Sequence, residues 1–200
     1  MKMDQLLLNI HPPSEKTLEN FIIGDNVETI STLKNFLSSK NLNFFYLWGA
    51  AGSGKSHLSE VVKKNNIEVI EDIESFNNFE QISAFNFFND CKENNKKLFV
   101  TGANSPKNMG LREDLASRLS WGLVFQIKAL TDDEKKLALL SHAHQKGILL
   151  DKKVIEYCMK YLKRDLHYLI ATLDALDNWS LKTKKPITIP LLQKLIAEKL

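Results

Sequence analysis

Cysteine is scarce in this sequence of 200 residues, which contains only two. Cys91 and Cys158 lie far apart, and neither has a CxxC partner. A disulfide framework, which small secreted domains use in place of a large core, is therefore excluded. Buried, reduced thiols are the interpretation that fits, and they are typical of a protein in the cytosol.

Long hydrophobic runs are also missing. No apolar stretch approaches the roughly 20 residues that a helix needs to cross a bilayer. The N-terminal segment MKMDQLLLNIHPPSEK has no long apolar part and no small-residue cleavage site, so we expect no signal peptide. The sequence therefore predicts a cytoplasmic protein with no membrane partner.

Charge of one sign is not in excess either. The chain has 27 Lys and Arg residues against 24 Asp and Glu residues, and its basic residues are scattered. A dedicated DNA-binding domain concentrates such residues on one face. Any contact with DNA is therefore expected to be indirect or non-specific, and sensitive to salt.

What the sequence does contain is an alternation of short apolar runs and amphipathic segments between residues 17 and 130. This order predicts an α/β core with a parallel sheet, and the helical pattern of residues 131–200 predicts a small all-helical lid. Residues 1–16 are expected to form an extended arm. The predicted strands are 43–48, 67–70, 97–102 and 123–127; the predicted helices are 26–38, 55–64, 77–93, 111–122, 151–162 and 165–181, with another from Thr131 and a last one whose first turn holds Pro190.

Some of these elements carry signals for their ends. Asp25 is the predicted N-cap of the helix at 26–38. Thr131 and Glu134 have the spacing of a capping box. Gly147 is placed where it would stop the helix that Thr131 begins.

A P-loop pattern follows the strand at 43–48 directly: residues 49–56 read GAAGSGKS and fit GxxxxGK[ST]. This spacing lets backbone N–H groups surround a phosphate chain at a helix N-terminus, with Lys55 reaching the β- and γ-phosphates and Ser56 holding Mg²⁺. An accidental glycine turn is the alternative, but a strand before and a helix after favour a nucleotide site. The predicted nucleotide contacts are Gly49, Ala50, Ala51, Gly52, Ser53, Gly54, Lys55, Ser56 and His57.

An acidic pair follows the second predicted strand. A P-loop nucleotidase needs a carboxylate at the end of a neighbouring strand to hold Mg²⁺. Asp72 suits the metal by its side-chain length, while Glu71 stands in the position more often filled by Asp. An exposed acidic turn is the alternative, so both residues are candidate metal ligands beside Ser56.

Three segments in order resemble one family. LWGAAGSGKSHL (47–58), DLASRLSWG (114–122) and LKRDLHYLIATLDALD (162–177) are similar to the AAA+ module of the bacterial replication initiator DnaA. More narrowly, they resemble the Hda-type regulators, which lack the initiator's other domains. The resemblance covers nearly the whole chain and implies an AAA+ fold with a helical lid.

The resemblance implies roles for two arginines. Arg118 matches the arginine finger that reaches into a neighbouring subunit's nucleotide site, and Arg164 matches the sensor-2 arginine, which contacts the nucleotide of its own chain. Taken alone, each is an ordinary charge on a helix surface. Arg112 stands six residues before Arg118 and could be confused with it.

The resemblance also extends to the arm. The segment QLLLNI at residues 5–10 is similar to the peptide by which Hda-type proteins dock on the DNA sliding clamp. Apolar side chains of such an extended peptide would fill a preformed pocket while glutamine anchors its edge. A leucine-rich strand packed on the body is the alternative. The predicted clamp contacts are Gln5, Leu6, Leu8 and Ile10.

The sequence departs from the family at two places. Few residues separate the P-loop helix from the strand at 67–70, so the core is expected to be trimmed by one strand and one helix. Ala103 stands where relatives carry a polar sensor-1 residue, and Asn104 could replace it. Both departures argue against efficient hydrolysis of the chain's own ATP.

These expectations combine into one hypothesis. The chain would bind ADP or ATP with Mg²⁺, attach to the sliding clamp, and promote hydrolysis of ATP bound to the AAA+ domain of DnaA; formation of a homo-oligomer stays open. An autonomous loader or motor ATPase is the alternative. A DNA-binding initiator ranks lower because no helix-turn-helix reader follows the lid.

Overall fold

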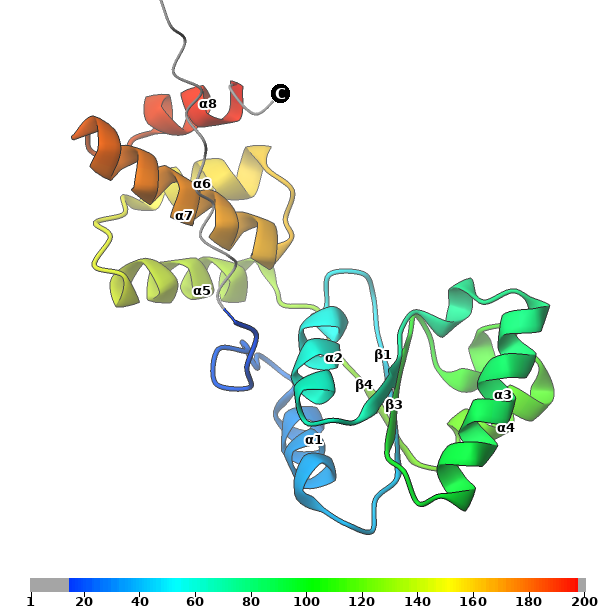
Figure 1. The fold of residues 1–200 in the computed structure, drawn as a ribbon. Helices are drawn as coiled ribbons and strands as arrows, with labels where there is room; N and C mark the ends of the chain where they lie inside the picture. The colour runs from blue at the N-terminus through cyan, green and yellow to red at the C-terminus, as the bar shows by residue number, and fades with distance from the viewer. Residues whose placement is uncertain (1–14, 198–200) are drawn as a thin grey trace, which may run out of the picture. The chain divides into compact units, whose positions relative to one another are not determined.

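The computed structural model describes residues 15–197, which form two compact units, Lys16–Leu130 and the residues from Thr131 onward (Figure 1). The first unit contains the strands, and the second is helical. The predicted clamp contacts at positions 5–10 lie outside the described residues.

A parallel sheet of four strands forms the centre of the first unit, in the order β2-β3-β1-β4. Each strand comes from one of the predicted apolar runs, and β3 is buried along its whole length, as an inner strand of a parallel sheet should be. Because the strands are parallel, their carboxyl ends meet at one edge of the sheet. The strands are β1 (Phe44–Trp48), β2 (Glu68–Ile70), β3 (Leu98–Gly102) and β4 (Leu123–Gln126).

Helices cover both faces of this sheet (Figure 1). Alternate side chains of β1 supply both sides: Phe45 and Leu47 join the apolar cluster under α1 and α2, whereas Tyr46 joins the cluster under α3 and α4. The predicted α/β core is thus confirmed. The helices are α1 (Val27–Ser38), α2 (Lys55–Lys64), α3 (Asn78–Glu93) and α4 (Glu113–Leu119), with 3₁₀ turns at Ile73–Ser75 and Pro106–Asn108.

On one side the sheet ends at β2, with no further strand among the described residues. Only Asn65, Asn66 and Ile67 separate α2 from β2, and β2 pairs with β3 at the end of the strand order. So short a connection leaves no room for another strand and helix. The trimmed core that the sequence predicts is confirmed for the described residues.

The start of α1 differs from the prediction. The residue before the helix is Asn26, and neither it nor Asp25 caps the helix through its side chain. The Asn26 amide instead donates to the carbonyls of Ile23 and Lys128, and its oxygen accepts from the Lys128 N–H at 2.8 Å. The predicted Asp25 cap is wrong because a buried amide joins this helix start to the chain after β4.

The second unit consists of α5 (Asp132–Gln145), α6 (Lys152–Tyr161), α7 (Leu166–Thr183) and α8 (Ile189–Ala197). The capping box at α5 is confirmed: the Thr131 hydroxyl accepts from the Glu134 N–H, and the Glu134 carboxylate accepts from the Thr131 N–H. Gly147 follows α5 with a φ of 69°, which suits its predicted role as a stop. Buried apolar residues of all four helices form a separate core for this unit, among them leucines of α5, α7 and α8 and Val154, Ile155, Cys158 and Met159 of α6.

None of the helices in the described part of the chain combines the length and hydrophobicity that a bilayer span requires.

Candidate functional site

The loop between β1 and α2 lies at the carboxyl edge of the sheet, where parallel α/β folds place their ligands. Gly52 and Gly54 have φ values of 75° and 102°, which only glycine adopts without strain. The Gly49 N–H donates to the Gly102 carbonyl at the end of β3 over 3.1 Å. A Cβ at position 49 would lie 2.3 Å from the Ile127 carbonyl oxygen. The loop is therefore held close to two neighbouring strands.

Lys55 opens α2 and is 9% exposed. Its ammonium donates to the loop's own carbonyls at Gly49 and Ala50, so it stays beneath the loop. The buried Ser53 hydroxyl has no hydrogen-bond partner among the described residues. An ammonium, a buried hydroxyl and the N–H groups of a helix N-terminus are together a fit for a phosphate chain.

The two candidate carboxylates differ in their surroundings. Glu71 forms an ion pair of 2.9 Å with Lys63 in the last turn of α2. Asp72 has a φ of 49°, and its N–H donates to the buried Thr101 hydroxyl at the end of β3. Within residues 15–197 its carboxylate makes no hydrogen bond or ion pair, and no three His, Cys, Asp or Glu residues cluster as a metal site would require. Of the two candidate carboxylates, Asp72 is thus the one without a partner among the described residues.

His57, a predicted nucleotide contact, is used to hold the chain that precedes α1. Its ring nitrogen lies 2.8 Å from the Thr17 carbonyl, and Phe21 packs edge-on against the ring at 5.2 Å. The same Phe21 ring covers Gly54, where a Cβ would be 2.7 Å away. Sequence reasoning missed Phe21, although the apolar run before Gly24 was a signal that this segment packs on the core.

Tyr46 anchors the loop after β3, which contains Ala103. Its hydroxyl donates to the Asn104 carbonyl over 2.7 Å and leaves no space for a side chain at Gly102. Burial, with a smaller contribution from the charge of Glu74, raises the pKa of Tyr46, so the phenol stays protonated. Asn104 is therefore held through its backbone, and the sequence carried no signal for this bond.

The two arginines near α4 have different environments. Arg112 makes a bidentate contact with Asp114: its Nε donates to Oδ1 over 3.2 Å and its Nη2 donates to Oδ2 over 2.8 Å. This hydrogen bonding raises the pKa of Arg112. Arg118 donates from Nε to the Asn89 side-chain oxygen over 3.2 Å, and its guanidinium lies 3.9 Å from the centre of the Trp121 ring. Its two terminal nitrogens donate to no described residue. Asp114 thus engages Nε and one terminal nitrogen of Arg112, whereas both terminal nitrogens of Arg118 have no hydrogen-bond partner among the described residues.

Arg164 lies in the helical unit, between α6 and α7. Its Nη1 donates to Asp132 at 2.7 Å, and its Nε donates to the Met159 carbonyl at 3.1 Å. This side chain is 59% exposed, so the bond to Asp132 is one that another anion could replace.

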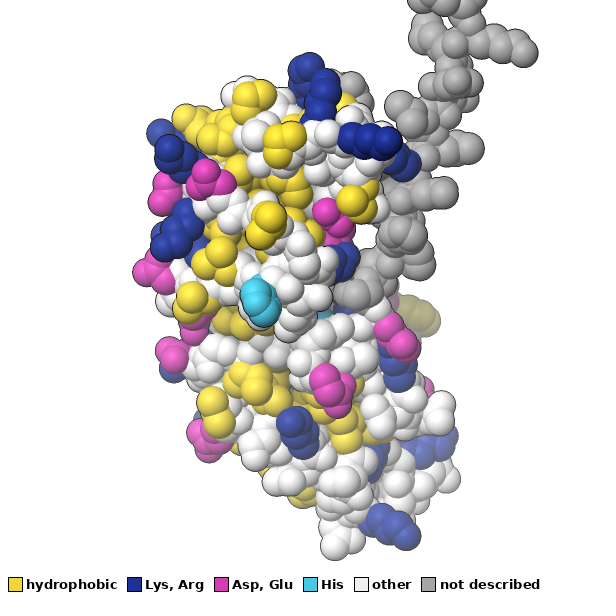
Figure 2. Space-filling model, turned by 90° about the vertical axis from the view of Figure 1, so that its left-hand side faces the viewer, with side chains coloured by type: hydrophobic (Ala, Val, Ile, Leu, Met, Phe, Trp, Pro, Cys, Tyr) yellow, Lys and Arg dark blue, Asp and Glu magenta, His cyan; other side chains and the backbone are white. Residues whose placement is uncertain are grey.

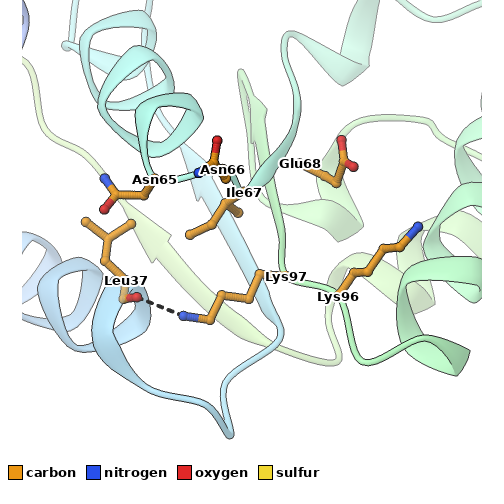
Figure 3. A pocket seen from close by; sticks show the side chains of 7 residues that line it. All are labelled: Leu37, Asn65, Asn66, Ile67, Glu68, Lys96 and Lys97. Carbon is orange, nitrogen blue, oxygen red and sulfur yellow. Dashed lines mark hydrogen bonds between the residues drawn. The ribbon is translucent and has the colours of Figure 1, made fainter.

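A separate hollow of about 400 Å³ opens at the opposite edge of the sheet, where β2 and β3 begin (Figure 3). Asn65, Asn66 and Glu68 line it together with Lys97, whose ammonium donates to the last carbonyls of α1, at Phe36 and Leu37. Burial lowers the pKa of Lys97. Lys97 thus closes a helix end, and the second lysine of the lining, Lys96, pairs with Asp90 over 3.4 Å, so both cations of this hollow already have partners.

On the face that Figure 2 shows, Lys and Arg side chains are interspersed with Asp and Glu side chains and do not gather in one basic patch. This agrees with the scattered basic residues of the sequence. The face has no concentrated positive surface of the kind that nucleic-acid-binding domains present.

Comparisons with known proteins give consistent matches. A family model of the bacterial DnaA ATPase domain matches residues 59–126, and a model of the Hda lid domain matches residues 132–196. A protein of Haemophilus influenzae described as uncharacterized is 30% identical over 96% of this chain and 98% of its own length.

Solved structures show the same fold at low identity. Domain III of the replication initiation protein DnaA from Thermotoga maritima matches with a TM-score of 0.73 at 16% identity, over 92% of this chain and 97% of that chain. AMPPCP-bound DnaA from Aquifex aeolicus matches with a TM-score of 0.67 at 20% identity, over 82% of this chain and 65% of that chain.

Proposed function

Because the chain belongs to the Hda-type DnaA-related AAA+ proteins, we propose that it regulates the initiation of DNA replication by promoting hydrolysis of ATP bound to DnaA. Its α/β core and helical lid form an AAA+ fold. In this proposal the chain keeps an adenine nucleotide of its own at the P-loop, acts in the cytoplasm, and presents Arg118 to the nucleotide of DnaA.

The geometry of Arg118 is the observation that carries the proposal. Its Nε is held by Asn89 and one face of the guanidinium is covered by Trp121, while the terminal nitrogens have no partner among the described residues. A guanidinium fixed at one edge can offer its other edge to phosphate oxygens, where it stabilises charge that develops during phosphoryl transfer.

The chain's own nucleotide site supports an anchoring role. The P-loop N–H groups and Lys55 would hold the phosphates, and Ser56 with Asp72 would hold Mg²⁺, which neutralises phosphate charge when it is bound. The other carboxylate, Glu71, forms an ion pair with Lys63 at the surface. Ala103 offers no polar group at the loop after β3. A site of this composition suits retention of ADP or ATP better than rapid turnover.

A comparison of two arginine variants tests the proposal. Purified DnaA loaded with ATP is incubated with clamp-bearing DNA and with wild type, Arg118→Ala or Arg112→Ala. We expect Arg118→Ala to reduce the stimulated hydrolysis rate by roughly 10³-fold, the scale of an arginine finger, and Arg112→Ala to leave it within about twofold of wild type. Equal stimulation by wild type and Arg118→Ala would remove the proposed role of this arginine.

Docking on the sliding clamp is proposed from the sequence of the arm alone. Gln5, Leu6, Leu8 and Ile10 would supply the glutamine and the apolar anchors of an extended peptide. We expect the double variant Gln5→Ala, Leu6→Ala to lose binding to immobilised clamp while its melting temperature stays that of wild type. Retained clamp binding by this variant would rule out docking through the arm.

One observation favours a second function, that of an autonomous ATPase. The Asp72 carboxylate has no partner among the described residues and follows β2 at the carboxyl edge of the sheet. A single-turnover assay of the isolated protein separates the two functions. Appreciable hydrolysis that Asp72→Asn abolishes would favour the autonomous enzyme, and retention of intact ATP would favour the regulator.

A further inference from the structure

The indole of Trp121 makes cation–π contacts with two side chains. The Arg118 guanidinium lies 3.9 Å from its ring centre, and the Lys92 ammonium lies 4.1 Å from the same centre. Phe85 adds a second aromatic contact to Arg118, at 5.0 Å. Cations over an aromatic face are attracted by its quadrupole. Trp121 therefore holds two positive groups at one place on the core.

The position of this ring is fixed by the backbone around it. The Trp121 N–H donates to the Arg118 carbonyl over 3.0 Å, in the turn that ends α4. At Gly122 a Cβ would lie 2.3 Å from the Phe44 carbonyl oxygen, so the chain passes β1 at a distance that only glycine allows. Phe88 meets the indole edge-on at 6.5 Å. The backbone at Trp121 and Gly122 is thus fixed and the ring packs against Phe88, although Trp121 is 44% exposed.

The ring restricts the arginine in a way that the Asn89 hydrogen bond alone does not. A single bond at Nε leaves the guanidinium able to rotate about that bond, whereas the indole, whose ring centre lies 3.9 Å from the guanidinium, restricts that rotation. An arginine that is free in solution loses rotamer entropy when it is fixed. If the ring fixes Arg118 in advance, a partner's phosphate does not have to overcome that entropy.

We propose that Trp121 is a positioning residue, which holds the plane of the Arg118 guanidinium for the reaction in the partner's nucleotide site. The inference rests on the proposed function for its activity readout. Lys92 contacts the same ring and adds positive charge beside Arg118. In this proposal it is the Trp121 ring, and not Lys92, that orients the Arg118 guanidinium.

The test compares Trp121→Phe, Trp121→Leu and a control variant, Tyr161→Leu, which removes an exposed ring from the helical unit. In the DnaA hydrolysis assay we expect Trp121→Leu to lower the saturating stimulated rate on the order of tenfold, with an unchanged half-saturating concentration. Trp121→Phe keeps an aromatic face and is expected to recover most of the rate, and Tyr161→Leu should match wild type. A stimulated rate that Trp121→Phe retains and Trp121→Leu loses would show that an aromatic ring at this position, and not its volume, positions Arg118.

A second readout does not depend on activity. The Nε–H of Arg118, assigned by its loss in Arg118→Ala, should give an NMR signal displaced by the ring current of the indole in wild type. This displacement should disappear in Trp121→Leu, and the backbone signals of β3 should not move. An unchanged Arg118 signal in Trp121→Leu overturns the proposal.

A third comparison uses the double variant. In an Arg118→Ala background, Trp121→Leu should have no further effect on stimulation; a further loss would mean that Trp121 acts independently of the arginine and would overturn the proposal. If wild type does not stimulate DnaA at all, the proposed function fails, while the NMR comparison still decides whether the Trp121 ring lies against Arg118 in solution.

Discussion

At the scale of single residues, glycines set how closely the P-loop approaches the sheet. Gly49 lies against the Ile127 carbonyl and Gly102 lies against the Tyr46 hydroxyl, and a Cβ would overlap each of these atoms. Gly54 lies under Phe21 with a φ that side chains resist. The nucleotide site thus depends on missing side chains as much as on the charged ones.

Gly49→Ala tests this dependence. The added Cβ meets a backbone oxygen that cannot move aside, so we expect a loss of about 1–3 kcal/mol in the free energy of unfolding and weaker binding of a fluorescent ADP. Gly110→Ala is the control: its φ of 65° makes alanine strained, but no atom lies within 4 Å of the new Cβ. Gly110→Ala should bind ADP like wild type; equal loss of binding in both variants would contradict the explanation.

At the scale of helices and strands, charged hydrogen bonds connect elements that lie far apart in the sequence. Asp174 of α7 accepts from His142 and Lys146 at the C-terminal end of α5, both at 2.7 Å. Burial raises the pKa of Asp174, but these hydrogen bonds outweigh burial, and the net effect lowers the pKa below its ordinary value of 3.8. The carboxylate therefore favours the folded state whenever it is ionised.

The pH dependence of Asp174→Asn follows from this shift. Because the pKa is lower in the folded state, the stabilisation is fully present above the ordinary value of 3.8 and is lost as the pH falls through the folded value. At pH 7 we expect Asp174→Asn to cost about 1 kcal/mol, and the difference from wild type should shrink in acid. Urea unfolding at pH 7 and pH 3 measures it. The control is Asp90→Asn, in the exposed pair with Lys96, which should cost less than about 0.5 kcal/mol.

At the scale of the whole molecule, the chain consists of two units with separate apolar cores. The α/β unit has one cluster under each face of its sheet, and the helical unit has one cluster to which α5, α6, α7 and α8 all contribute. The P-loop and Arg118 both belong to the α/β unit, but α2, which follows the P-loop, covers one face of the sheet, and α4, which carries Arg118, covers the other. This separation suits a protein that holds one nucleotide and acts on another.

Nucleotide binding should therefore stabilise the protein independently of Arg118. At an ADP concentration a hundred times the Kd, binding adds about 2.7 kcal/mol to the free energy of unfolding. We expect this to raise the melting temperature of wild type and of Arg118→Ala equally, and to leave Lys55→Ala unchanged. Calorimetry with and without ADP measures the shift. A shift in Lys55→Ala as large as that in wild type would mean that the nucleotide binds elsewhere.

The amino-acid sequence by itself determined the fold class, the strand positions and the P-loop, because these depend on local patterns. A short apolar run before GAAGSGKS is enough to predict a buried strand and a phosphate loop, and the spacing of Thr131 and Glu134 is enough to predict a helix start. The ordered set of segments around Lys55, Arg118 and Arg164 was enough to identify the family.

Only the tertiary structure decided which partners the candidate side chains have, because those partners lie on distant elements. It separates Asp72 from Glu71, since Lys63 on α2 engages only one of them. It separates Arg118 from Arg112, since Asn89 on α3 and the Trp121 ring lie beside only one of them. No spacing in the sequence encodes these contacts. They exist because the helices pack on the same sheet. This packing brings Lys63 of α2 to Glu71 after β2, and Asn89 of α3 to Arg118 in the last turn of α4.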